Sequence, residues 1–126
     1  MNEKNAFEVS IEIAANASKY WGFLWFIDRQ GNKRMKDFEI VDPGSKQANT
    51  LKALIEALNI LQAPCMLTIY TDMDYLISAY QNNWIQKWKE NGWQKSNGNE
   101  LKNKELWQRI AELVSDHSVK FVKEDT

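Results

Sequence analysis

Residues 68–93, TIYTDMDYLISAYQNNWIQKWKENGW, carry the pattern that decides the fold. The stretch opens as a short apolar run, becomes acidic at Asp72 and Asp74, and then places Trp84 and Trp88 four residues apart. A short apolar run is typical of a strand, and a spacing of four puts two side chains on one helical face. The stretch therefore predicts a strand followed by helices. It leaves open whether the tryptophans form a core or a surface for nucleic acid.

Upstream of this stretch, the sequence predicts three strands. FEVSIEIAA (7–15) alternates, which places Val9, Ile11 and Ile13 on one face. YWGFLWFIDRQGNKRMKDFEIV (20–41) predicts two more strands around a turn at DRQGNK (28–33). The second strand is apolar on both faces, so we expect an exposed apolar patch of a kind that often marks a partner surface. The side chains expected to form this patch are Trp21, Phe23 and Trp25.

The remaining elements complete an α/β pattern. ANTLKALIEALNILQ (48–62) has a leucine stripe typical of a helix, which Pro64 ends. MLTIYT (66–71) predicts a buried strand, KELWQRIAELVSDH (104–117) an amphipathic helix and VKFVK (119–123) the last strand. The predicted order is β-β-β-α-β-α-α-β. It indicates a five-stranded mixed sheet, three antiparallel strands followed by two parallel ones, with helices on one face.

Length and composition exclude several classes of protein. With 126 residues, we expect a single domain over 1–126. The net charge of −1 gives no overall attraction to nucleic acid or to anionic lipid. The single cysteine, Cys65, excludes an internal disulfide and is expected to be inert. We see no signal peptide and no apolar run long enough to cross a membrane, so the expected location is the cytoplasm.

From Cys65 to Val122 the sequence resembles bacterial ribonuclease H of the type I class. The motifs that carry the resemblance are YTDMDYLI (70–77), WIQKWKENGW (84–93), LKNKELWQRI (101–110) and HSVKFVK (117–123). Their order and spacing match the family's motifs. The resemblance implies a ribonuclease-H-like fold without the usual C-terminal helix, and His117 is expected to have a structural role.

The resemblance implies chemistry that this chain has mostly lost. Family members use four carboxylates and two magnesium ions to cut the RNA strand of an RNA–DNA hybrid. Here Asp72 is retained, whereas Asn16 and Thr50 stand where two of the other acids are expected. The chain ends at VKFVKEDT (119–126), so we expect the loop and helix that carry the fourth acid to be missing.

Neighbouring acids are weighed as substitutes. Asp74 is expected to cap the following helix through its side chain. Glu12 lies ~13 Å from Asn16 by strand rise, too far to replace it. Glu124 or Asp125 could reach Asp72 from the end of the last strand, but two carboxylates make a poor magnesium site. We therefore expect no tightly bound cofactor, and Mg²⁺ or Mn²⁺ only if cleavage survives.

The tryptophan region resembles the family's grip on nucleic acid. In that interpretation, Lys87, Lys89 and Lys95 meet phosphates and Trp93 packs on a sugar or base. In the other, Trp84, Trp88 and Trp107 are core, and the position of Trp93 is open. The expected binding set further includes Ser45, Lys46 and Asp74, although the first two also suit a solvated helix start.

Two functional classes follow from these observations. The first is a non-catalytic ribonuclease-H-like module that binds nucleic acid, with modest affinity for an RNA–DNA hybrid, or a protein. The second is a reduced ribonuclease H that uses Asp72 with acids from its tail or from another chain. A third option is that a separate polypeptide supplies the last helix. A homodimer or a protein partner could bind through the uncovered sheet face.

Overall fold

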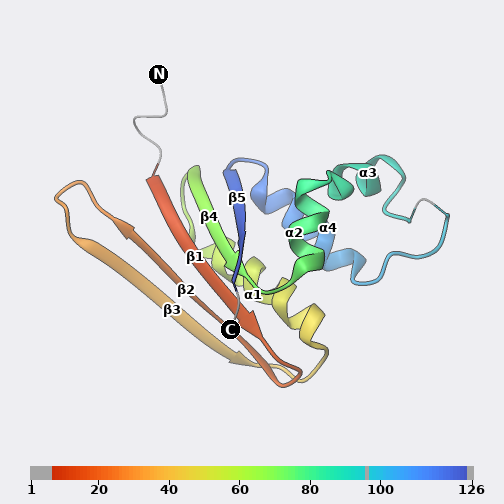
Figure 1. Ribbon diagram of the computed structural model, residues 1–126, viewed down its shortest axis with the longest axis horizontal. Coiled ribbons are helices and arrows are strands. Elements are labelled where there is room, and N and C mark those ends of the chain that lie inside the picture. Colours follow the sequence, from red (N-terminus) through yellow and green to blue (C-terminus); the bar gives the residue numbers. More distant parts are fainter. Residues whose placement is uncertain (1–6, 96, 125–126) are drawn as a thin grey trace.

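The five strands form one mixed sheet in the computed structural model, which describes residues 7–95 and 97–124 (Figure 1). The elements in chain order are β1 (Phe7–Ala15), β2 (Lys19–Ile27), β3 (Lys33–Val41), α1 (Lys46–Ile60), β4 (Cys65–Thr71), α2 (Asp74–Gln81), α3 (Trp84–Glu90), α4 (Lys104–Val114) and β5 (Ser118–Lys123). The strand order is β3-β2-β1-β4-β5. β1, β2 and β3 pair antiparallel, and β4 pairs parallel with β1 and β5, which confirms the predicted mixed sheet.

The helical region between β4 and β5 differs from the prediction. Three helices lie there instead of two, because the chain breaks at Asn83, which has a φ of 63°. Asparagine is one of the few residues that adopts this left-handed conformation readily. A second such residue, Asn103 (φ 62°), stands directly before α4. The segment between these two asparagines therefore consists of the short helix α3 and the loop that follows it.

One face of the sheet packs against the helices and holds the core. Val9, Ile11 and Ile13 of β1 are buried, as are Leu51 and Leu54 of α1, which lies across β1 and β2. The predicted core face of β1 is thus confirmed. The prediction of a buried β4 is confirmed for Leu67, Ile69 and Thr71. It does not hold for Met66, which is 41% exposed because alternate residues of this strand face away from the helices.

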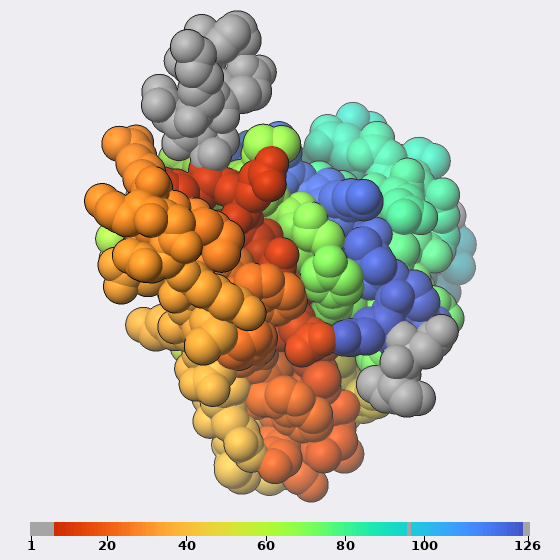
Figure 2. All heavy atoms as spheres, turned by 60° about the vertical axis from the view of Figure 1, so that its left-hand side comes forward, coloured from red at the N-terminus to blue at the C-terminus, as the bar shows by residue number. Residues whose placement is uncertain are grey.

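The opposite face of the sheet has no helix over it among the described residues. Figure 2 shows the strands side by side on this face. Trp21 is 37% exposed, as predicted, whereas Phe23 and Trp25 are half-buried. Their rings lie on one another, with centroids 5.3 Å apart, and Trp25 stacks on Tyr70 of β4 at 6.3 Å. We call this surface the open face.

Two residues singled out by the sequence are part of this framework. Cys65 is buried, and burial raises the pKa of its thiol. The backbone N–H of Cys65 donates to Nδ1 of His117 at 3.0 Å, which ties the start of β4 to the segment before β5. His117 therefore makes a structural contact. No helix within the described residues is long and apolar enough to cross a membrane.

Candidate functional site

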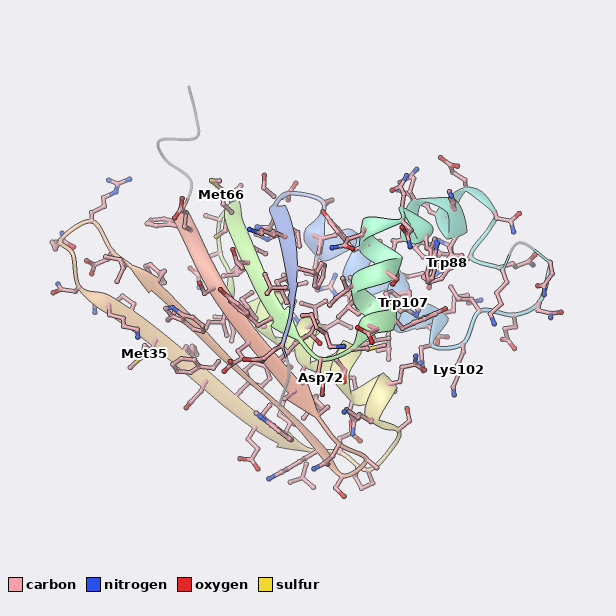
Figure 3. The ribbon with its side chains drawn as sticks, in the orientation of Figure 1. Met35, Met66, Asp72, Trp88, Lys102 and Trp107 are labelled. Atoms are coloured by element: carbon pink, nitrogen blue, oxygen red, sulfur yellow. The ribbon has the colours of Figure 1, made fainter. Side chains whose placement is uncertain are left out.

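Asp72 follows β4 at the C-terminal ends of the parallel strands β1, β4 and β5, which we call this edge of the sheet (Figure 3). Its side chain is 25% exposed, and Oδ2 lies 3.1 Å from Nζ of Lys46 in the first turn of α1. The other oxygen, Oδ1, is buried and has no hydrogen-bond partner among the residues that the structure describes. The retained aspartate is thus already paired with a cation from its own chain.

Two glutamates lie at the same edge of the sheet. Glu12 of β1 is in register with Tyr70 of β4, and paired residues on neighbouring strands point to the same face of the sheet. Tyr70 lies two residues before Asp72, so Glu12 lies close to the end of β4 that Asp72 follows. Glu124 continues from β5, where its N–H donates to the carbonyl of Thr71 at 2.8 Å. The carboxyl groups of Glu12 and Glu124 hydrogen-bond to each other. We call Glu12, Asp72 and Glu124 the carboxylate cluster.

The carboxylate cluster holds a proton near neutral pH. The hydrogen bond to Glu12 is the main cause that raises the pKa of Glu124 to about 7. Burial and the negative charges of Glu12 and Asp72 act in the same direction. Two carboxylates at hydrogen-bond distance cannot both ionise cheaply, so the pair shares one proton until the pH exceeds this value.

Glu12 was predicted to lie too far from Asn16 to replace it, and its place in the carboxylate cluster was not predicted. The distance had been measured to Asn16, but Asn16 is outside this group. Its Oδ1 accepts hydrogen bonds from the N–H groups of Ser18 and Lys19 at 2.8 and 2.9 Å, and so closes the turn between β1 and β2. The signal that could have found Glu12 is the parallel register of β1 with β4, rather than the position of a motif.

The other predicted acid positions make no second site. Thr50 is buried, and its hydroxyl donates to the carbonyl of Lys46 at 2.8 Å inside α1. Of the two tail residues predicted to approach Asp72, Glu124 does so, because the charge of Asp72 raises the pKa of its carboxyl group. Asp125 lies outside the described residues.

The residues present do not fit a two-magnesium centre. In the described part of the chain, no group of three or more His, Cys, Asp or Glu side chains could hold a metal ion. A magnesium ion needs several free oxygen ligands with negative charge. Here one oxygen of Asp72 faces Lys46, and the two glutamates share a proton. A divalent ion would have to displace both the ammonium group and the proton.

Three further predicted binding residues have local roles. The prediction that Asp74 caps α2 was wrong. The cap position is Met73, which makes no side-chain hydrogen bond there, and Asp74 pairs with Nζ of Lys123 at 2.6 Å. Asp74 is already the first residue of α2, one position past the cap. Ser45 caps α1 by accepting from the N–H of Ala48 at 3.0 Å. Lys46 pairs with Asp72, so each of these three residues has a partner within the chain, and their binding of nucleic acid stays a prediction.

The tryptophan region is a packed aromatic group with one open side. Trp107 is buried and meets Trp88 edge-on at 5.1 Å, while Trp84 is half-buried (Figure 3). Tyr75 contacts all three rings, with centroids 5.6 to 6.4 Å apart. The core interpretation is therefore right for Trp88 and Trp107. It is only partly right for Trp84.

A cleft of about 610 Å³ opens beside this aromatic group. Its lining consists of aromatic, cationic and amide side chains: Tyr75, Trp84, Lys87, Trp88, Asn91, Gln94, Lys95 and Asn97. The structure thus brings Lys87 and Lys95 together, one from α3 and one from the following loop. Asn91 holds this loop in place by donating to the carbonyl of Lys95 at 3.0 Å. We call this the tryptophan cleft.

Lys89 and Trp93, two predicted contact residues, do not line the tryptophan cleft. Lys89 is exposed on α3, and Trp93 is half-buried with a φ of 64°. The rings that line the tryptophan cleft are those of Tyr75, Trp84 and Trp88, which the sequence did not single out for contact. The contact predicted for Trp93 stays a prediction. The helical spacing of Trp84 and Trp88 was the available signal, because two rings on one face can present an edge to solvent as well as to the core.

The sheet order, with an aspartate directly after β4, is that of a ribonuclease-H-like protein. The model of the RNase H family matches residues 13–123. The chain belongs to the ribonuclease H family.

Named relatives agree with this assignment. Ribonuclease H of Caldicellulosiruptor saccharolyticus is 43% identical over 91 residues, which cover 72% of this chain and 61% of that protein. The crystal structure of LC9-RNase H1 superposes with a TM-score of 0.78 at 17% identity, over 94% of this chain and 63% of the other. The foamy viral protease–reverse transcriptase in complex with RNA/DNA hybrid has a TM-score of 0.70 at 17% identity, and the match covers 94% of this chain and 17% of that protein. The chain thus spans about three-fifths of the length of the curated relative.

Proposed function

We propose that this chain is a cytoplasmic ribonuclease-H-like domain that binds nucleic acid without cutting it. The observation that carries the proposal is the state of the carboxylate cluster. Lys46 occupies Asp72, and Glu12 and Glu124 hold a proton between them. The negative charge that divalent cations would need is thus partly neutralised from within the chain.

The electrostatic balance of the carboxylate cluster supports the loss of cleavage. Near pH 7 the Glu12–Glu124 pair holds its proton about half of the time, since the pKa of Glu124 is about 7. The ammonium group of Lys46 offsets the charge of Asp72. The remaining negative charge is between one and two units, shared by three carboxyl groups. Two divalent cations need a larger negative charge and freely available oxygen atoms.

The tryptophan cleft supports nucleic-acid binding. Lys87 and Lys95 can reach phosphates, and the exposed edges of Trp84 and Tyr75 can meet a sugar or a base. The foamy viral relative was solved with an RNA/DNA hybrid, so a hybrid is the first ligand to test. We expect modest affinity, because residues 84–107 contain five lysines and three glutamates. Few phosphate contacts give a shallow dependence on salt.

A binding and cleavage assay on one labelled RNA–DNA hybrid tests both parts of the proposal. We expect binding by fluorescence anisotropy and no cleavage with Mg²⁺ or Mn²⁺. Lys87→Glu should weaken binding by about tenfold, because it reverses a charge that faces the phosphates. Lys102→Glu is the matched control: Lys102 is exposed but does not line the tryptophan cleft (Figure 3). Equal effects of the two substitutions would mean that binding occurs elsewhere.

A second candidate function is a reduced, metal-dependent ribonuclease H. It is favoured by the meeting of Glu12, Asp72 and Glu124 at one edge, and by the unpartnered Oδ1 of Asp72. Cleavage of the hybrid that requires Mg²⁺ or Mn²⁺ and disappears in Asp72→Asn would establish this function. Such a result would refute the non-catalytic proposal.

A further inference from the structure

The open face is a continuous surface whose composition can be given row by row. Residues paired across neighbouring strands point to the same face, so each row crosses the sheet. One row consists of Met35, Trp25, Ser10, Thr68 and Lys120, and the next of Asp37, Phe23, Glu12, Tyr70 and Val122. Beyond the first row lie Lys33, Ile27, Glu8, Met66 and Ser118, and beyond the second lie Glu39, Trp21 and Ala14.

Apolar side chains gather on the open face along β2 and on β4, and Met35 adds one from β3. Met35 is 60% exposed, and Trp21 and Met66 each exceed a third. Between them the rings of Phe23, Trp25 and Tyr70 form a continuous aromatic band. A contiguous apolar patch of this kind is uncommon on a soluble monomer and marks an interaction surface.

The charges of the open face are separated along the strands. The half that contains Lys33 also carries Lys120 and Glu8, two lysines less one glutamate. Among the strand residues, the other half carries three carboxylates, Glu12, Asp37 and Glu39, and one lysine, Lys19, which pairs with Glu39. Glu124, directly after β5, lies against Glu12 in the same half and adds no positive charge. One half is thus net positive by one unit and the other net negative by two.

This separation makes the open face complementary to a copy of itself. We propose that two copies of this chain pack open face to open face, related by a two-fold axis that lies across the strands. Such an axis places Lys33 of one copy opposite Glu39 of the other, and Trp25 opposite Phe23. An axis along the strands would instead bring like charges together, which is unfavourable. A symmetric dimer needs this kind of self-complementary patch.

The size of the open face is sufficient for a dimer. β1, β2 and β3 have nine residues each, β4 has seven and β5 has six. With strands ~4.8 Å apart and ~3.3 Å per residue, they give a face of roughly 630 Å². A standard-size protein interface buries about 600–1,000 Å² on each partner, and the open face lies at the lower end of this range. Sheet-on-sheet packing is a common way to bury two apolar faces.

Charge also favours a second copy over a nucleic acid on this surface. The strands of the open face carry one more carboxylate than ammonium groups, and both rings nearest to lysines, Trp21 and Trp25, already hold Lys19 and Lys33 over them at 5.5 and 5.9 Å. A polyanion would meet no net positive charge here. The dimer surface and the tryptophan cleft are therefore separate sites, and each can fail without the other.

Sedimentation equilibrium of the full chain, over a wide range of protein concentration, tests this inference. We expect a reversible dimer whose dissociation constant rises by about tenfold in Lys33→Glu. Lys36→Glu is the matched control, because Lys36 lies three residues along β3, on the other face of the strand. Met35→Glu, at an exposed position, should abolish the dimer without disturbing the fold, as judged by circular dichroism.

The charge swap gives the sharpest readout. Glu39→Lys alone should weaken the dimer, and Lys33→Glu combined with Glu39→Lys should restore it. A monomeric mass at every concentration would overturn the inference and indicate that a different chain covers the open face. A dimer that neither Lys33→Glu nor Met35→Glu affects would overturn it as well.

Discussion

The carboxylate cluster and the tryptophan region belong to the same fold, but they differ in how many of their side chains are neutralised or packed by the rest of the chain. In the tryptophan region the indoles still pack on one another, with Trp88 and Trp107 5.1 Å apart. At the carboxylate cluster, Lys46 and a shared proton neutralise much of the charge. Packing depends on volume and tolerates changes around it, whereas a metal centre needs each charge in place. Packing and metal binding can therefore be lost independently of one another, and the following experiments test each in this chain.

The largest expected effect tests the structural side of this comparison. Trp107→Ala should lower the free energy of unfolding by about 3–5 kcal/mol, because it leaves a cavity where a fully buried indole stood. Trp21→Ala, at a position 37% exposed on the open face, is the control and should cost much less. Urea denaturation measures both. An equal loss of unfolding free energy in both variants would mean that the aromatic group around Trp107 does not form part of the hydrophobic core.

A charge reversal at Lys46 should have an intermediate effect. Lys46→Glu replaces the cation beside Asp72 with a fourth acid, so the folded state should now bind Mn²⁺ and its melting temperature should rise by a few degrees when Mn²⁺ is added. The wild-type protein should show little change. Lys52→Glu is the matched control, because Lys52 forms a similar ion pair with Asp42 at 2.9 Å, away from the cluster. An equal response to Mn²⁺ in the wild type would show that Lys46 does not block a cation.

The smallest expected effect is a dependence of stability on pH. Because the pKa of Glu124 is about 7 in the folded chain and lower in the unfolded chain, the folded state binds more protons between these values. Its contribution to stability is therefore fully present below the unfolded pKa and is lost as the pH rises through about 7. Glu124→Gln should flatten this dependence in thermal melts from pH 4 to 8. A wild-type stability that rises with pH across this interval would contradict the shared proton.

Sequence patterns predicted most of the sheet because strands declare themselves locally. The alternation in β1 and the turn at Asp28–Lys33 required no tertiary information. The division of the tryptophan region into α2 and α3 could not be predicted from periodicity, because it depends on one residue, Asn83, adopting a left-handed conformation. β4 was predicted as buried because its composition is apolar, yet only alternate residues face the helices.

The candidate site was harder to predict, because it depends on the register between strands that are distant in sequence. Asp72 was found from a motif, but its neighbour Glu12 became visible only through the pairing of β1 with β4. The partner of Asp74 is Lys123, 49 residues further along the chain, and no local pattern indicates it. The sequence predicted Lys46 as a contact for nucleic acid and did not indicate its ion pair with Asp72. This ion pair joins α1 to the end of β4, and the sequence alone could not align these two elements.

The ion pair of Lys46 has a consequence for how this domain responds to its surroundings. A lysine side chain is covalently part of the chain, so the cation beside Asp72 is supplied once per molecule at synthesis and cannot be removed by a chelator. The positive charge beside Asp72 is therefore present at every concentration of divalent cations.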